Sequence, residues 1–414
     1  MIRHFAFAAL LALAGPVAAQ DAPLSCRLVF DGAPPLLNAC QGGERLEVAF
    51  VGDVLLHGGL QRRGYAEGFG AVWGAVLPFW ASADIAVANL EGPVAPGFTG
   101  INRQGTDPGP VFGTAVYTSY PMFNYHPMVT QALAAGGVDI VTTSNNHSMD
   151  RGSGGFDATL DQVAAAGLVQ VGGVRAGAAR QFATVTDSPL GSLVWIACTY
   201  STNGIADPYG QTLNCFQEQA ALLSLIGSYA AQPGVAGVIV LPHWGDEYQP
   251  SPNRAQRALA AAMVGAGAAL VVGTHPHVVQ GWEVIQGPAG QVPVIYSTGN
   301  FVSGQPGLDR QTGLLAWVTL CRGAPSADLG QAIRARLRVA QAGWVPLRMG
   351  RDAGGHALFS VGTDGATGYV AEARNLIAGR IPGFEMGARY ECAASGTAGT
   401  AGTAGGGGLS LALQ

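Results

Sequence analysis

The sequence predicts a layered α/β fold, and three observations carry that prediction. Short, almost purely apolar segments recur along the chain, as at residues 48–51 and 238–241, and such runs are typical of strands buried on both faces. Segments with helical character lie between them, for example residues 156–166, which stop at Gly167. Each apolar run also ends abruptly in polar residues. Strands that alternate with helices favour a layered core that binds ligands beyond the carboxyl ends of its strands.

The chain begins with the features of a secretory signal peptide over residues 1–19. Arg3 precedes an apolar run at residues 5–14, which is too short to span a bilayer, and small residues follow up to Ala19. We therefore expect cleavage near Ala19 and a secreted, periplasmic or extracellular protein. An uncleaved membrane anchor is the alternative. Residues 20–45 follow as an irregular lead-in.

A core domain is expected over residues 46–310, where six apolar segments each end in polar residues. If these segments are parallel strands, their polar ends meet at one edge of a sheet. The polar residues at or just beyond these ends are Asp53, Glu91, Asn146, His147, His243, His275, His277 and Asn300.

The pattern changes in the C-terminal part of the chain. Residues 314–320, 333–339 and 356–361 have the character of antiparallel strands, so residues 311–394 are expected to form a β-rich extension packed on the core. Residues 395–414 are a Gly/Thr/Ala-rich segment of the kind that forms a disordered tail.

The composition excludes several classes of function. All 21 residues counted as Lys plus Arg are arginines, so Schiff-base chemistry and a lysine-containing phosphate loop are excluded. The net charge of −5 and the lack of a basic run give no indication of nucleic-acid binding. We therefore expect neither a nucleic-acid partner nor a nucleotide-binding loop.

The cysteines are even in number and belong to a chain with an export signal, which favours three disulfides over a zinc–cysteine site. The sequence does not determine their connectivity. Local spacing favours Cys26–Cys40 and Cys198–Cys215, which leaves Cys321–Cys392.

Histidines at strand ends indicate a metal site. His275 and His277 flank a proline, and residues i and i+2 of an extended segment point the same way, so two imidazoles would face one point. An incidental pair in a loop is the alternative. His243 and His147 follow other predicted strands, and chance explains that recurrence poorly.

Carboxylates complete the candidate set. Asp53 and Glu91 end two strands, although singly they could be a turn residue and a salt-bridge partner. Oxygen ligands with imidazoles and no thiolate suit Zn, Mn, Fe or Co, and we predict one or two divalent ions. His57 is an additional candidate, and Asn300 either orients a ligand or closes a turn. Asp150 is interpreted as a brace for the following helix.

Six motifs, in this order, resemble the CapA family of bacterial capsule or poly-γ-glutamate synthesis proteins over about residues 46–303. They are VGDVLL at 51–56, NLEGPV at 89–94, NNHSMD at 145–150, HWGDEY at 243–248, GTHPHVVQ at 273–280 and YSTGNF at 296–301.

The CapA family resembles a branch of the calcineurin-like metallophosphoesterases. This resemblance implies an α/β/β/α sandwich, two sheets flanked by helices, with metal at the strand ends. It also implies that Asp53 and His147 take part in catalysis, with His147 as general acid. The metal ligands implied by position are Asp53, Glu91, Asn146, His243, His275 and His277.

The leading hypothesis is an extracytoplasmic, metal-dependent hydrolase that acts on a cell-envelope or capsular polymer, such as γ-glutamyl amide bonds. The alternative is a non-catalytic component of the capsule synthesis machinery at the membrane, with a structural or vestigial metal site. A metallophosphoesterase is a third hypothesis, against which Leu55 argues because those enzymes carry histidine there. A catalytic metal site keeps an open coordination position, whereas a structural one is closed.

Overall fold

The computed structural model describes residues 26–30, 37–38, 41–288, 290–324, 336–360 and 369–392. Its compact body spans Leu28–Arg389, and Met1–Arg27 with Tyr390–Gln414 form a second unit. The predicted signal peptide and C-terminal tail lie outside the described residues. Among the helices that are described, none has the length and apolar character needed to cross a membrane.

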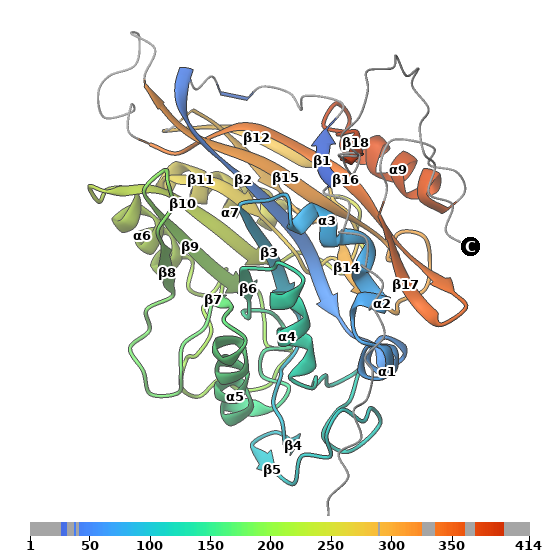
Figure 1. The fold of residues 1–414 in the computed structure, drawn as a ribbon. Coiled ribbons are helices and arrows are strands. Elements are labelled where there is room, and N and C mark those ends of the chain that lie inside the picture. The colour runs from blue at the N-terminus through green and yellow to red at the C-terminus, as the bar shows by residue number, and fades with distance from the viewer. Residues whose placement is uncertain are drawn as a thin grey trace, which may run out of the picture. The chain divides into compact units, whose positions relative to one another are not determined.

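The larger of two central sheets has eight strands, in the order β17-β16-β15-β2-β3-β6-β7, with β14 also paired to β2 (Figure 1). Its central strands run parallel, so their carboxyl ends share one edge. These parallel strands are β2 (Gln41–Leu55), β3 (Ile85–Leu90), β6 (Ile140–Thr142), β7 (Val169–Val171) and β14 (Asn300–Ser303).

The smaller sheet has six strands, in the order β12-β13-β11-β10-β9-β8. Four central strands are parallel, and an antiparallel strand closes each edge. The parallel strands are β9 (Ser192–Thr199), β10 (Val235–His243), β11 (Ala268–Val272) and β13 (Gly290–Ile295), and the edge strands are β8 (Ala183–Thr186) and β12 (Trp282–Gly287).

The core forms three apolar layers because strand residues alternate between faces. Val48 and Phe50 of β2 pack with Trp195 and Ile239 of the smaller sheet, and this layer joins the two sheets. The opposite face of β2 packs against helices, as does the outer face of the smaller sheet. The fold is therefore the α/β/β/α sandwich that the sequence predicted.

Helices cover the outer face of each sheet. Those beside the larger sheet are α1 (Gly58–Glu67), α2 (Gly70–Trp73), η1 (Gly74–Val76), α3 (Leu77–Trp80), α4 (Met128–Ala135) and α5 (Gly152–Ala165). Those on the smaller sheet are α6 (Gln219–Ala230) and α7 (Arg254–Ala266).

The strands after residue 310 belong to the larger sheet itself, whereas the sequence predicted an extension packed on the core. β15 (Thr312–Ala324) pairs antiparallel with β2, with Ala316 opposite Phe50. Leu314 and Ala316 lie in the layer between the sheets, whereas Leu315 and Trp317 face the helices, so β15 is a central strand buried on both sides. The sheet continues through β16 (Arg338–Asp352) and β17 (Gly355–Ser360), and α9 (Tyr369–Arg380) follows.

The lead-in predicted for residues 20–45 contains regular structure. β1 (Cys26–Phe30) pairs with β18 (Ala388–Cys392) in a two-stranded sheet, and β2 already begins at Gln41. Two short strands, β4 (Phe98–Gly100) and β5 (Arg103–Gln104), form a further pair in the loop after β3.

One predicted disulfide is present in the structure. Cys198 and Cys215 are bonded, with their Cα atoms 5.1 Å apart, and Cys321 is also disulfide-bonded. Cys40 and the side chains of Cys26 and Cys392 lie outside the described parts of the structure, so the other two predicted pairings remain predictions.

Candidate metal centre

The oxygen-bearing residues of the site come from the larger sheet. Asp53 lies near the end of β2, Glu91 directly follows β3, and Asn146 lies in the loop after β6. Because β2, β3 and β6 are adjacent and parallel, these three side chains reach the same edge. Each of them is at most 1% exposed.

The histidines come from the smaller sheet. His243 is the last residue of β10, and His275 and His277 follow β11, its parallel neighbour. A β-bridge between His243 and Thr274 extends the pairing past the end of β11. All three imidazoles are therefore presented at the carboxyl end of the second sheet, facing the carboxylates of the first.

A glycine contact brings Asp53 close to the chain after β13. A Cβ atom on Gly52 would lie only 1.7 Å from the carbonyl oxygen of Gly299. The Asp53 amide donates to that same carbonyl at 3.3 Å. Only glycine permits this approach, and it places Asp53 beside Asn300.

The backbone of the histidine segment is not extended, contrary to the geometry assumed from the sequence. His275 has φ of 101° and His277 has φ of 58°. Such values are uncommon for residues with a Cβ, and they persist where the surrounding fold imposes them, often at functional sites. The two imidazoles therefore converge because of a left-handed backbone and not because of strand alternation.

The candidate ligand atoms form overlapping groups. One ligand atom each from Glu91, His243 and His275 lie within 4.8 Å of one another, and the same holds for Asp53, Glu91 and His277. Glu91 Oε1 lies 3.6 Å from His243 Nε2 and 3.8 Å from His277 Nε2. Glu91 is common to both groups, which is compatible with one or two ions.

Hydrogen bonds on the far side of two imidazoles orient them toward Glu91. His243 Nδ1 lies 2.9 Å from the Thr274 hydroxyl, and His277 Nδ1 lies 3.0 Å from Asn300 Oδ1. His277 Nδ1 also lies 3.2 Å from Asp53 Oδ2, and these contacts leave Nε2 of each ring to face Glu91. Metal-binding histidines are commonly held in this way through their second nitrogen.

Two residues of the site have buried polar atoms without partners. Both carboxylate oxygens of Glu91 and Nδ1 of His275 are buried and make no hydrogen bond. The imidazole nitrogens of His243 and His277 lie 3.6 and 3.8 Å from Glu91 Oε1, too far for hydrogen bonds, and a bound cation would compensate the buried carboxylate more closely. The donor set, two carboxylates, an amide and three imidazoles, therefore fits a divalent transition metal.

Burial and mutual charge shift the acid–base properties of these residues. Burial would lower the pKa of His277, but the charges of Glu91 and Asp53 outweigh it and raise this pKa to about 9. Burial and the nearby imidazoles hold the pKa of His275 well below its usual value. Burial opposes ionisation of Asp53, yet its contacts with His277 and His243 lower its pKa.

His147 is held by an acidic neighbour. Its Nδ1 lies 2.8 Å from Asp150 Oδ2, and its ring meets the Phe123 ring edge-on at 4.7 Å. Burial alone would lower the pKa of His147, but the hydrogen bond and charge of Asp150 raise it. Asp150 therefore orients an imidazole, and is not the helix brace that the sequence suggested.

The family model described as "Bacterial capsule synthesis protein PGA_cap" matches residues 47–305. This chain belongs to that family. Two curated relatives are each 29% identical over 272 residues, namely "Capsule biosynthesis protein CapA" of Bacillus anthracis and "PGA biosynthesis protein CapA" of Bacillus subtilis (strain 168). The matched stretch is 63% of this chain but only 61% and 64% of those relatives. The resemblance noted from the six motifs is confirmed.

Solved structures give a weaker comparison. A hypothetical protein from Thermus thermophilus is 17% identical, with 76% of this chain and 99% of that one covered, at a TM-score of 0.35. A novel phosphatase of Mycoplasma pneumoniae is 14% identical, with 73% and 94% covered, at a TM-score of 0.38. TM-scores this low assign neither a fold nor a function to this chain.

The eight polar residues predicted at strand ends all lie within the PGA_cap match. One further candidate, His57, lies outside the groups of potential metal ligands among the described residues, and its Nδ1 accepts a hydrogen bond from the Gly304 amide at 3.2 Å. Asn300 lies beside His277, so of its two predicted roles the structure favours that of orienting a ligand.

Sequence reasoning missed several residues that surround the PGA_cap site. Glu247 forms a third potential metal group with His275 and His277. Asn89 donates to Asp53 Oδ1 at 2.8 Å, and Asn203 accepts from the Asn146 amide at 3.2 Å. Glu247 and Asn89 do lie in recognisable motifs, whereas Asn203 lies in a loop with no sequence signal of its role.

Proposed function

We propose that this protein is an extracytoplasmic, metal-dependent hydrolase that acts on a cell-envelope or capsular polymer. The observation that carries the proposal is the buried carboxylate of Glu91, which makes no hydrogen bond and lies among three imidazoles. Membership of a capsule synthesis family supports the polymer as substrate. The export signal expected at residues 1–19 supports the location.

The residues that would hold the ion are those of the two overlapping groups, together with Asn146. Asn146 Oδ1 lies 2.8 Å from His243 Nε2, so its oxygen faces the site. A divalent metal bound here would supply Lewis-acid polarisation of a carbonyl or phosphoryl oxygen. Leu55 argues against ordinary phosphoesterase chemistry, because those enzymes carry histidine at that position.

His147 is the proposed general acid. Its Nδ1 is bound to Asp150, so Nε2 is the nitrogen left to act on a substrate. The raised pKa favours the protonated form, which a proton donor to a leaving group requires. Phe123 packs against the ring and its amide donates to the same Asp150 oxygen at 2.6 Å, which keeps the pair in place.

The decisive experiment compares metal content with turnover. Purified mature protein should contain at least one divalent transition metal and should cleave γ-glutamyl polymer fragments or another anionic envelope polymer. His147→Ala should keep its metal and fold while kcat falls by about 10²–10⁴-fold. His126→Ala is the matched control, because that imidazole contacts Tyr65 and Tyr117 and lies in none of the potential metal groups.

The same variant separates hydrolysis from a non-catalytic assembly role. If the protein acts only in assembly, the wild type shows no turnover and His147→Ala restores capsule formation in a deletion strain of the native host. Full complementation combined with undetectable wild-type turnover would rule out the hydrolase. Loss of metal from His147→Ala would instead mean that this imidazole supports metal binding.

A further inference from the structure

An inner cavity of about 550 Å³ begins beside the candidate metal centre. It is lined by Tyr248, Val278 and the segment 307–310. The Tyr248 ring lies 6.0 Å from the His277 ring, and the Arg310 guanidinium lies over Tyr248 at 5.1 Å. Tyr248 has φ of 65°, a strained backbone conformation, and this residue lies at the rim of the site.

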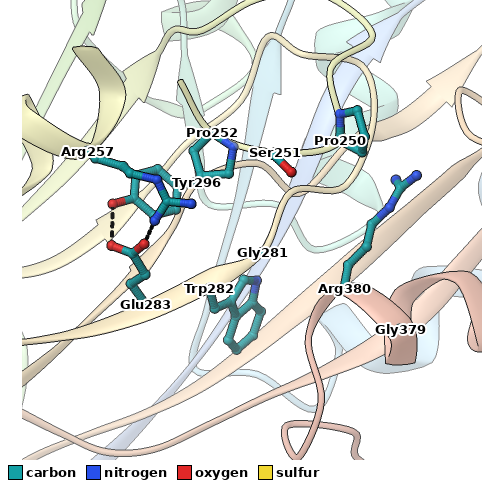
Figure 2. A pocket seen from close by; sticks show the side chains of 10 residues that line it. All are labelled: Pro250, Ser251, Pro252, Arg257, Gly281, Trp282, Glu283, Tyr296, Gly379 and Arg380. Carbon is teal, nitrogen blue, oxygen red and sulfur yellow. Dashed lines mark hydrogen bonds and ion pairs between the residues drawn. The ribbon is translucent and has the colours of Figure 1, made fainter. Parts of the chain in front are cut away.

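An outer cavity of about 530 Å³ lies between the loop before α7, β12 and the end of α9 (Figure 2). Figure 2 shows Arg257 and Glu283 on one side, Arg380 on the other and the Trp282 indole below them. Both cavities have the size of sites that take small molecules or segments of a chain.

The two cavities are neighbours along the same two segments of backbone. Residues 248–252 and 278–283 supply lining to both, and Gln280 Nε2 ties these segments together through the Gln249 carbonyl at 2.9 Å. Arg380 lines the outer cavity and Asp309 lines the inner one, and their side chains form an ion pair at 3.0 Å. That ion pair therefore stands at the boundary between the cavities.

Both arginines of the outer cavity bind carboxylates of the protein itself. Arg257 pairs with Glu283, and Arg380 pairs with Asp309. The side chains of Asp309 and Glu283 are 49% and 36% exposed, and ion pairs at such exposed positions are weak. A carboxylate from a ligand can therefore replace Asp309 on the guanidinium without large cost.

The rest of the outer cavity suits an apolar chain between charges. Trp282 offers an indole face, and Pro250 and Pro252 form part of the opposite wall. Arginine forks recognise planar carboxylates, and an aromatic face with prolines packs against methylene groups. A chain with carboxylates at intervals along an aliphatic or amide backbone matches this alternation.

We propose that the inner and outer cavities form one binding groove for a carboxylate-bearing chain that leads to the metal centre. Arg310 and Arg380 bind successive carboxylates, and the Arg380–Asp309 ion pair opens when the chain enters. This inference rests on the proposed function, because the groove would position the polymer that the metal centre cleaves.

The test measures binding of end-labelled glutamate oligomers to the metal-loaded full chain by fluorescence anisotropy. The wild type should bind a decamer more tightly than a trimer, because only the decamer spans both cavities. Arg380→Gln should weaken decamer binding about tenfold, the effect of one charge-assisted hydrogen-bonded pair, and should leave trimer binding unchanged. Asp309→Asn should tighten decamer binding about threefold, since it removes the internal competitor.

Two matched variants control for overall charge. Arg254→Gln removes a positive charge from the exposed face of the same helix as Arg257, and Asp187→Asn removes a negative charge far along the chain, in the loop between β8 and β9. Neither should change decamer affinity by more than about twofold. Equal effects of Arg380→Gln and Arg254→Gln, or equal wild-type affinity for trimer and decamer, would overturn the groove.

The measurement also separates this inference from the proposed function. If the wild type binds the decamer tightly but hydrolyses nothing, the groove proposal is supported and the hydrolase proposal is wrong. If the wild type cleaves the trimer and the decamer equally, with no difference in affinity, the hydrolase proposal is supported and the groove proposal is wrong. Tighter binding of polyphosphate or of glucuronate oligomers than of the glutamate decamer would overturn the assignment of a carboxylate chain with an amide backbone.

Discussion

The two sheets contribute different chemistry to the candidate metal centre. The larger sheet supplies the candidate oxygen ligands, Asp53, Glu91 and Asn146, from a backbone with no positive φ at any of them. The smaller sheet supplies imidazoles, and His275 and His277 both adopt left-handed backbone conformations. The oxygen side is therefore built by regular strand ends, whereas much of the nitrogen side is held by strain that the surrounding fold must offset.

This difference suggests how each side responds to change. Regular strand ends stay in place when a ligand side chain is altered, so substitutions of the oxygen-bearing side chains should act through charge. A strained loop depends on its contacts, so the nitrogen side should depend more on the metal and on packing. The following predictions examine that contrast, ordered from the largest expected effect to the smallest.

Glu91→Gln should have the largest effect, because Glu91 belongs to two potential metal groups. Metal affinity should fall by about 1000-fold, since both a ligand and a negative charge are lost. The metal-stripped variant should also melt at a lower temperature than metal-stripped wild type, because the charge interaction of Glu91 with His277 is lost. Metal titration and calorimetry measure the two changes. A higher melting temperature would show that the nearby imidazoles do not compensate the Glu91 carboxylate in the metal-free protein.

His243→Ala and His277→Ala should each lower metal affinity by about 100-fold. Both residues lie at or beyond strand ends, so the sheets should keep their structure, which circular dichroism measures. His356→Ala, on the hairpin strand β17, is the matched control and should retain wild-type metal content. If both site variants keep their metal, the ligand assignment on the nitrogen side is wrong.

Gly52→Ala should act on the oxygen side through packing. The added methyl group would meet the Gly299 carbonyl and displace Asp53 from Asn300 and His277. We expect a loss of about 3 kcal/mol in the free energy of unfolding and about tenfold in metal affinity. Gly70→Ala is the control, because a Cβ there meets nothing within 4 Å, and it should be neutral or slightly stabilising. Denaturant titration that ranks the two variants equally would contradict the close approach.

Asn203→Gly should have the smallest effect. Asn203 has φ of 53°, which glycine also adopts, so the substitution removes the amide without straining the loop. Its oxygen accepts from Asn146 and thereby turns the Asn146 oxygen toward the site. Metal affinity should fall about threefold, less than the usual loss for a partner behind a ligand, because Asn203 itself is exposed to solvent. A loss of metal affinity larger than that of His243→Ala would contradict the predicted order, in which the imidazole side contributes more than the support behind Asn146.

The sequence alone determined the parts of this protein that depend on local pattern. Apolar runs that end in Asp53, Glu91 or His243 indicated buried parallel strands with polar ends, because burial on both faces requires such runs. Local spacing favoured the pairing of Cys198 with Cys215. The ordered motifs identified the capsule synthesis family, which the comparison over residues 47–305 confirms.

Only the tertiary structure decided what depends on contacts between distant segments. The partner of Asn300 and the insertion of β15 beside β2 follow from strand order, which periodicity does not encode. The left-handed backbone at His275 and His277 also departs from the extended geometry that the HPH spacing suggested. Periodicity reports which residues are buried, whereas convergence of a site depends on how two separate sheets pack face to face.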